Sequence, residues 1–111
     1  MTDETFELCK AVYEATDWIE EDMDAIRDDG AIFKDDTHLI GDYGFTASYT
    51  SDYLLKRLPF PTELGRDSLA WIAKWEHGAG SAPKKQIWQR GSTPLIALLR
   101  LVLELKKEGI L

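Results

Sequence analysis

The last twenty residues, "STPLIALLRLVLELKKEGIL" (92–111), decide the fold class of this chain. Thr93 is a typical helix N-cap, Pro94 suits the first helical position, and Gly109 suits a helix stop. Ile110 then suits the hydrophobic contact of a Schellman motif. Apolar side chains cover most of the circumference, and a helix this apolar must be covered on more than one side. The segment therefore predicts a C-terminal core helix. Its polar strip consists of Arg100, Glu104, Lys107 and Glu108.

The segment before it, "LAWIAKWEHGAGSAPKKQIWQR" (69–90), predicts a hairpin. Apolar and other residues alternate from Leu69 to Trp75 with the period of a strand. A helix capped by Asp67 also fits residues 68–76, because leucine, isoleucine and alanine there are spaced for one. We prefer the strand, since "QIWQR" offers a partner across a Gly/Pro loop. The tip, "GAGSAPKK", lacks the P-loop pattern. A small basic spot beside Trp88 is typical of ordinary surface and consists of Lys84, Lys85 and Arg90.

Further upstream, "YTSDYLLKRLP" (49–59) predicts a two-turn helix. Thr50 or Ser51 caps it, and Pro59 excludes the α conformation at the residue before it. The apolar face would be Leu54, Leu55 and Leu58. A loop carrying Gly65 would lead to the hairpin.

The N-terminal third predicts two more helices. The first begins behind Thr2 and carries an apolar stripe at helical spacing, formed by Phe6, Leu8, Cys9, Val12 and Tyr13. In "TDWIEEDMDAIRDDG" (16–30), Asp17 and Glu20 read as a capping box and Gly30 as a stop. One face of this second helix would be acidic and would carry Glu20, Glu21, Asp24 and Asp28.

Residues 31–48 carry a weaker pattern. The runs "AIF" (31–33) and "HLI" (38–40) are compatible with strands, separated by a turn at "KDDT". The following "GDYGFTAS" (41–48) reads as loop. Together these elements predict a single α+β domain over residues 1–111. In it the C-terminal helix covers a small, mostly antiparallel sheet, and the first helix lies beside it.

Charge is distributed unevenly. The net charge is −7, but residues 1–37 hold thirteen acids against three bases, and residues 38–111 hold seven acids against ten bases. An acidic total argues against sequence-independent nucleic-acid binding, which needs cations. The acidic end would instead attract a basic partner, or imitate nucleic acid in a basic cleft. A solvated acidic face is the simpler interpretation.

Catalytic patterns are weak. A nucleophile needs a nearby base, and nothing in the sequence places His38 or His77 beside Cys9. No ligand spacing for a transition metal is present, and the acidic cluster fails the EF-hand register. We therefore predict no enzyme, no cofactor and no metal. A small enzyme or ligand-binding domain stays open as an alternative, with a pocket holding His38 or His77 beside a buried carboxylate.

The start, "MTDETFELCK", lacks the cationic end and apolar run of a secretion signal, and no apolar stretch reaches membrane-spanning length. These features, together with the single cysteine, predict a protein of a reducing cytoplasm.

Three stretches, "ELCKAVYEATDW", "YTSDYLLKRLP" and "TPLIALLRLVLELKKEGIL", resemble small uncharacterised proteins encoded by bacteriophages and prophages. The resemblance covers about half the chain and implies a phage origin, a location in the cytoplasm of a bacterial host and an α+β layout, with no activity or functional residue to transfer. The segment "WIEEDMDAIRDDG" departs from that group by its acidity. We expect a non-enzymatic accessory protein that binds a host or phage protein. A homodimer is also possible, because the last helix is large for one small sheet to cover.

Overall fold

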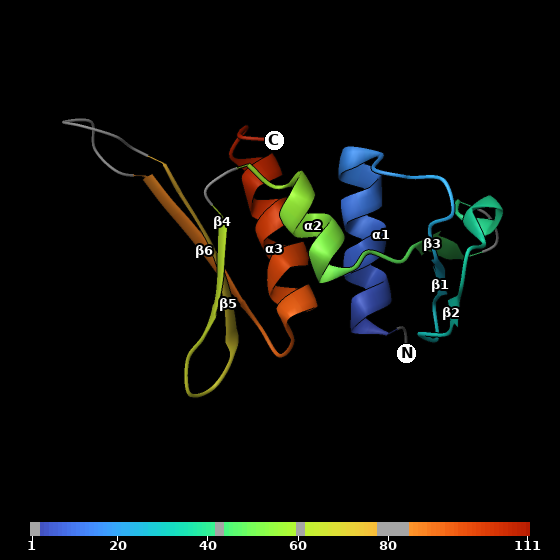
Figure 1. Cartoon of the computed structure of the whole chain (residues 1–111), viewed down its shortest axis with the longest axis horizontal. Coiled ribbons are helices and arrows are strands. Elements are labelled where there is room, and N and C mark those ends of the chain that lie inside the picture. Colours follow the sequence, from blue (N-terminus) through green and yellow to red (C-terminus); the bar gives the residue numbers. More distant parts are fainter. Residues whose placement is uncertain (1–2, 42–43, 60–61, 78–84) are drawn as a thin grey trace. The chain divides into compact units, whose positions relative to one another are not determined.

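The computed structural model describes residues 3–41, 44–59, 62–77 and 85–111, without the side chains of His77 and Lys85. By its internal contacts the chain divides into two compact units, Met1–Tyr49 (unit 1) and Thr50–Leu111 (unit 2). The described residues form three α-helices and two antiparallel three-stranded sheets, one sheet in each unit (Figure 1). The α+β class predicted from the sequence is confirmed. The single domain over residues 1–111 stays a prediction.

Unit 1 joins one helix to a small sheet with the strand order β2-β1-β3. Helix α1 contacts β3, and β1 is the central strand, antiparallel to both neighbours. The elements are α1 (Glu4–Thr16), β1 (Ala25–Arg27), β2 (Ile32–Phe33), the 3₁₀ helix η1 (Thr37–Leu39) and β3 (Phe45–Ala47).

Helix α1 confirms the predicted first helix, with its cap one residue later than expected. The Asp3 carboxylate accepts a hydrogen bond from the backbone N–H of Phe6 at 3.0 Å. Phe6, Cys9 and Val12 are buried, as the stripe predicted. The helix ends at Asp17, whose backbone is left-handed (φ 57°) and whose N–H donates to the carbonyl of Tyr13.

The predicted second helix over residues 17–30 is wrong. Asp17 closes α1 instead of starting a helix, and residues 25–27 form β1. Ala25 lies opposite Ala47 and Ile26 opposite Thr46, and all four are buried. Pairing on both sides satisfies the backbone of β1, whereas a helix here would have carried two aspartates at its negative end. Tertiary pairing therefore overrides the local helical pattern.

Two predictions over residues 31–48 are also corrected. Ile32–Phe33 form a strand as expected, but Thr37–Leu39 form a 3₁₀ turn instead of a strand. The Thr37 hydroxyl accepts from the N–H of Met23 at 2.7 Å and donates to its carbonyl at 3.1 Å, which fixes this turn against the start of β1. Residues 45–47, predicted as loop, form β3, while residues 42–43 lie outside the described part.

Unit 2 combines two helices with a sheet in the order β4-β5-β6. The short helix at 51–57 and the hairpin are confirmed. The strand predicted from Leu69 begins at Trp71, and residues 68–70 belong to the turn before it. Of the predicted tip at 78–85, Lys85 begins β6 and residues 78–84 lie outside the described part. The predicted loop around Gly65 is wrong, because five residues there pair with β5. The elements are α2 (Ser51–Arg57), β4 (Thr62–Arg66), β5 (Trp71–His77), β6 (Lys85–Gly91) and α3 (Pro94–Lys107).

Helix α3 is the core of unit 2, as predicted. The Thr93 hydroxyl accepts from the N–H of Ile96 at 3.1 Å, and the N–H of Ile110 donates to the carbonyl of Leu105 at 2.9 Å. Gly109 has a positive φ of 77°, as the predicted stop requires. Strands β5 and β6 and helix α2 all contact α3, so it is covered from the sheet and from a neighbouring helix (Figure 1). Its buried residues are Ile96, Ala97, Leu98, Leu99, Leu101, Val102 and Leu105.

Candidate binding surface

The sheet of unit 2 has one face toward α3 and one face away from it. Ala73 and Trp75 of β5 are buried, and β5 contacts α3. Successive residues of a strand point to opposite faces, and residues paired across strands share a face. The register therefore places eight residues on the face away from α3, which we call the open sheet face: Glu63, Gly65, Ile72, Lys74, Glu76, Gln86, Trp88 and Arg90.

Trp88 is the largest apolar group on the open sheet face, with 48% of its surface exposed. It lies opposite Lys74 on β5. The guanidinium carbon of Arg90 stands 5.4 Å from the centroid of the Trp88 ring, within the range of a cation–π contact. Arg90 also reaches Asp67, with Nη2 3.4 Å from Oδ2. A chain of charge and ring contacts thus supports the exposed ring.

Asp67 organises the turn between β4 and β5. Its Oδ1 accepts hydrogen bonds from the N–H groups of Leu69 at 2.8 Å and Ala70 at 2.7 Å. These two bonds, and then the positive charge of Arg90, hold the pKa of Asp67 below its usual value. The turn presents Leu69 with 88% of its surface exposed. An exposed leucine therefore stands next to the open sheet face.

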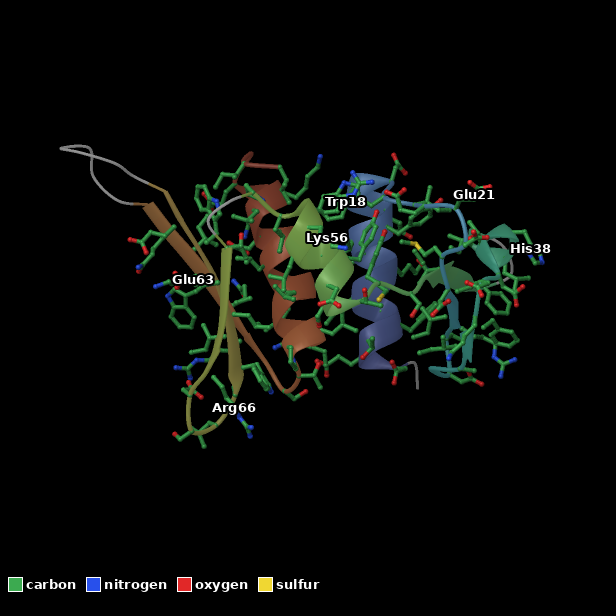
Figure 2. All side chains as sticks on the ribbon, in the orientation of Figure 1. Trp18, Glu21, His38, Lys56, Glu63 and Arg66 are labelled. Atoms are coloured by element: carbon green, nitrogen blue, oxygen red, sulfur yellow. The ribbon has the colours of Figure 1, made fainter. Side chains whose placement is uncertain are left out.

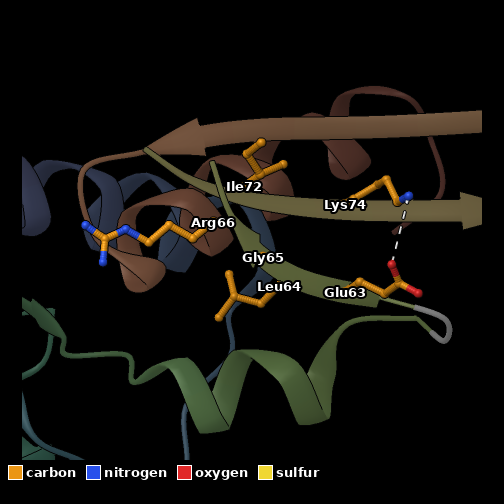
Figure 3. Close-up of a pocket in the computed structure, with 6 residues that line it drawn as sticks. All are labelled: Glu63, Leu64, Gly65, Arg66, Ile72 and Lys74. Carbon is orange, nitrogen blue, oxygen red and sulfur yellow. Dashed lines mark ion pairs between the residues drawn. The ribbon is translucent and has the colours of Figure 1, made fainter. Parts of the chain in front are cut away.

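A hollow of about 300 Å³ lies over β4 and β5 (Figure 3). Lys74 crosses one end of it, with Nζ 3.9 Å from a Glu63 carboxylate oxygen and 3.7 Å from one of Glu76. At the centre a Cβ built on Gly65 would meet no atom within 4 Å, so the missing side chain leaves the hollow open. The lining residues are Glu63, Leu64, Gly65, Arg66, Ile72 and Lys74.

Arg66 stands at the other end of the hollow from the Glu63–Lys74 pair (Figures 2 and 3). Its guanidinium carbon lies 5.4 Å from the centroid of the Trp71 ring, which orients the side chain. Within the described part of the chain, no carboxylate stands within 4.0 Å of this guanidinium. Arg66 pairs with Trp71, so by the same alternation both side chains belong to the face toward α3 and not to the open sheet face. The hollow therefore has an apolar floor and one charge-compensated end, and the guanidinium of Arg66 borders it from the opposite face of β4.

The four acids proposed as a partner-binding face lie in unit 1 but not on a helix. Asp24 precedes β1 and Asp28 follows it, so their Cα atoms are about 13 Å apart along an extended chain. On a helix the same spacing of four residues would have brought them to about 6 Å. Glu20, Glu21 and Asp28 are exposed, and the Asp24 carboxylate accepts from the N–H of Asp35 at 3.0 Å. The acids remain a surface feature, spread along an extended segment.

Other acids of unit 1 have structural partners. Asp29 accepts from Arg27 at 2.6 Å and from the N–H of Ala31 at 3.0 Å. The hydrogen bond from Arg27 is the largest cause that lowers the pKa of Asp29 to about 2, followed by the bond from Ala31. Asp3 caps α1, and its backbone N–H donates to the carbonyl of Asp28. A part of the negative charge therefore supports the fold of this unit.

Of the predicted catalytic candidates, His38 and Cys9 lie in unit 1, where the first is exposed and the second is buried. His38 lies on η1 with its side chain 75% exposed, and its nearest carboxylate, Asp36, is also partly exposed (Figure 2). His77 ends β5 in unit 2, and its side chain lies outside the described part. Burial raises the pKa of the Cys9 thiol to about 11, opposed by a backbone hydrogen bond from Tyr49 and assisted by the charge of Asp3. Among the described residues, no three His, Cys, Asp or Glu side chains gather as metal ligands.

The sequence reasoning missed Gly65 and Arg66 because β4 carries no apolar run. It noticed Trp88 only as the neighbour of a basic spot. The pairing of β4 and β6 with β5 brings Gly65, Arg66 and Trp88 into one sheet, and this pairing cannot be read from a single sequence. No described helix has both the length and the apolarity that a membrane crossing requires. No family model matches the chain, and neither a curated protein nor a solved structure matches it.

Proposed function

We propose that this protein is a non-enzymatic phage or prophage accessory protein that acts by binding another protein through the open sheet face. The phage origin rests on the resemblance of the three stretches described above. The binding role is supported chiefly by one observation, the half-exposed Trp88 held in place on a sheet face that α3 does not cover.

The composition of the open sheet face supports this role. Tryptophan and arginine are enriched in the centres of protein interfaces, and truncation of such residues often costs most of the affinity. Here Trp88 and Arg90 contact each other, and Ile72 lies opposite Arg90 on the neighbouring strand. Charged residues at the rim, such as Glu63 and Glu76, would give the interface its orientation.

The test compares immobilised wild-type protein with two variants on bacterial lysate. Trp88→Ala removes the ring from the open sheet face, and Lys106→Ala, the control, removes an exposed cation from the end of α3. We expect one or a few proteins to be captured by the wild type and by Lys106→Ala, and to be lost with Trp88→Ala. The purified partner should then bind Trp88→Ala at least ~10-fold more weakly.

Capture of the same proteins by all three forms would contradict the proposal. Capture of nothing but abundant nonspecific proteins would also contradict it. Sedimentation velocity at several concentrations serves as the control, since self-association would compete for the same surface. The homodimer stays a prediction that this control measures.

A second candidate function is favoured by the separation of charge between the units. Unit 1 holds fourteen acids against three bases, whereas unit 2 holds six acids against ten bases. Of the three bases in unit 1, Arg27 is already paired with Asp29. On this view unit 1 imitates nucleic acid and occupies a basic cleft of a host or defence protein.

Charge reversal separates this candidate from the first. Glu20, Glu21 and Asp28 are exposed and are changed together to lysine, while Asp24 is kept because it bonds the backbone of Asp35. If unit 1 imitates nucleic acid, the variant loses its partner, and duplex DNA and salt displace the partner from the wild type. Binding that neither DNA nor salt disturbs would reject this candidate.

A further inference from the structure

Strand β4 is an edge of its sheet, because it pairs with β5 and with no other described strand. An edge strand carries a row of backbone N–H and C=O groups that another extended segment can pair with. β4 is five residues long, and it contains no proline. The hollow over Gly65 lies directly on this strand. A backbone docking edge and a side-chain hollow therefore lie together.

The charges of the hollow select the occupant. Lys74 is neutralised by Glu63 and Glu76, which leaves a net negative charge at that end. At the other end Arg66 stands on Trp71 without a carboxylate from the described residues. A stacked guanidinium with its polar edge free is well suited to a carboxylate. A polyanion would be repelled by Glu63 and Glu76, so a single carboxylate next to an apolar group fits best.

We propose that a partner protein docks an extended segment along β4, with an apolar side chain over Gly65 and Ile72 and a carboxylate against Arg66. This proposal rests on the protein-binding function proposed above and names the site and the chemistry of the partner. Gly65 and Arg66 are consecutive on β4, so their side-chain positions lie on opposite faces of the sheet. A residue of the partner segment shares the face of the β4 residue that it lies opposite. The partner segment therefore carries an apolar residue and an aspartate or glutamate at consecutive positions.

The probe is a set of capped hexapeptides in which leucine or phenylalanine stands directly beside glutamate, in either order, and the other residues are threonine. Each is titrated into the ¹⁵N-labelled full chain and followed by NMR. The expected result is saturable binding with shifts confined to the amides of residues 62–66 and 71–75. Peptides with glutamine in place of glutamate should bind at least ~10-fold more weakly, because the charge-assisted bond to Arg66 is lost. No binding, shifts elsewhere, or equal binding of both peptides would overturn the proposal.

Variants of the hollow provide the second measurement. Gly65→Val places a branched side chain in the space over β4; its Cβ meets no atom within 4 Å, and valine suits a strand. It should weaken peptide binding at least ~10-fold while the rest of the amide spectrum is unchanged. Arg66→Gln should remove the preference for glutamate over glutamine. Lys107→Gln, at the exposed end of α3, is the matched control and should bind as the wild type does.

The two proposals fail in different ways. A partner whose capture needs Trp88 but is unaffected by Gly65→Val and Arg66→Gln would overturn the β4 site and leave the binding function standing. Peptides that bind at β4 in a protein that captures no partner would support the site and count against the binding function.

Discussion

The backbone of α3 lies directly against Gly91. A Cβ on Gly91 would stand 2.5 Å from the backbone nitrogen of Ala97 and 2.9 Å from the carbonyl carbon of Ile96. Only a residue without a side chain allows β6 and the first turn of α3 to approach this closely. Gly65 has the opposite surroundings, with no atom within 4 Å of its missing Cβ. The two strand glycines of unit 2 thus have different roles: one permits packing, and the other leaves a hollow.

Gly91→Ala should lower the free energy of unfolding by about 2–3 kcal/mol, because backbone atoms of α3 must move to admit the methyl group. Gly65→Ala is the matched control and should change stability by less than about 1 kcal/mol, since alanine restricts the unfolded chain and meets nothing in the fold. Urea denaturation followed by circular dichroism measures both. Equal effects of the two substitutions would show that the contact at Gly91 is not tight.

Tyr49→Phe should lower the free energy of unfolding by about 1–2 kcal/mol. The Tyr49 hydroxyl donates to the carbonyl of Trp18 at 2.7 Å, and Tyr49 is only 1% exposed, so the variant loses a hydrogen bond in a buried place. The same measurement on Tyr53→Phe provides the control, because that hydroxyl bonds Arg57 at the exposed surface. An unchanged urea midpoint for Tyr49→Phe would contradict the assignment of this bond.

Cys9 should react slowly in the folded protein. Burial raises its pKa from 9.0 to about 11, so at pH 8 the thiolate is roughly 100-fold rarer than in the unfolded chain. Labelling with iodoacetamide, followed by mass spectrometry with and without urea, should give a native rate at least ~100-fold below the unfolded rate. Rapid labelling without urea would be inconsistent with a buried thiol.

The same shift makes stability depend on alkaline pH. The unfolded thiol ionises first, so the folded state loses stability as pH rises from about 9 to about 11. Cys9→Ala removes this contribution, and its urea midpoint should fall less over that interval. Parallel midpoints for the two proteins would contradict the raised pKa.

Asp29 should contribute to acid sensitivity with the opposite sign. Its pKa in the fold is about 2, below its model-compound value of 3.8, because Arg27 and the N–H of Ala31 stabilise the carboxylate. The stabilisation that the Asp29 carboxylate gives the folded state is complete above about pH 4. It is lost as the pH falls toward 2, because the unfolded chain takes up the proton first. The difference in urea midpoint between wild type and Asp29→Asn should therefore shrink over this interval. A difference that does not vary with pH would contradict the charge pairing.

Helices that carry a capping residue at the start and a stop residue at the end could be predicted from the sequence. Thr50 and Pro59 set the two ends of α2, and Thr93 and Gly109 set those of α3, because capping and stop residues act on the backbone within one turn. The sequence favours the β5–β6 hairpin for a similar reason, since the alternation from Leu69 to Trp75 has a complementary run, "QIWQR", close by in the chain.

The sequence by itself determined these elements, the α+β class and the segregation of acids into the first third of the chain. Tertiary structure alone decided that residues 25–27 are a central strand instead of a helix, and that Thr62–Arg66 joins the sheet. Both are short segments without local signals strong enough to fix their conformation, so their backbones follow the partners that pair with them. The hollow at Gly65 and Arg66 depends on that pairing, which brings residues from two strands to one place.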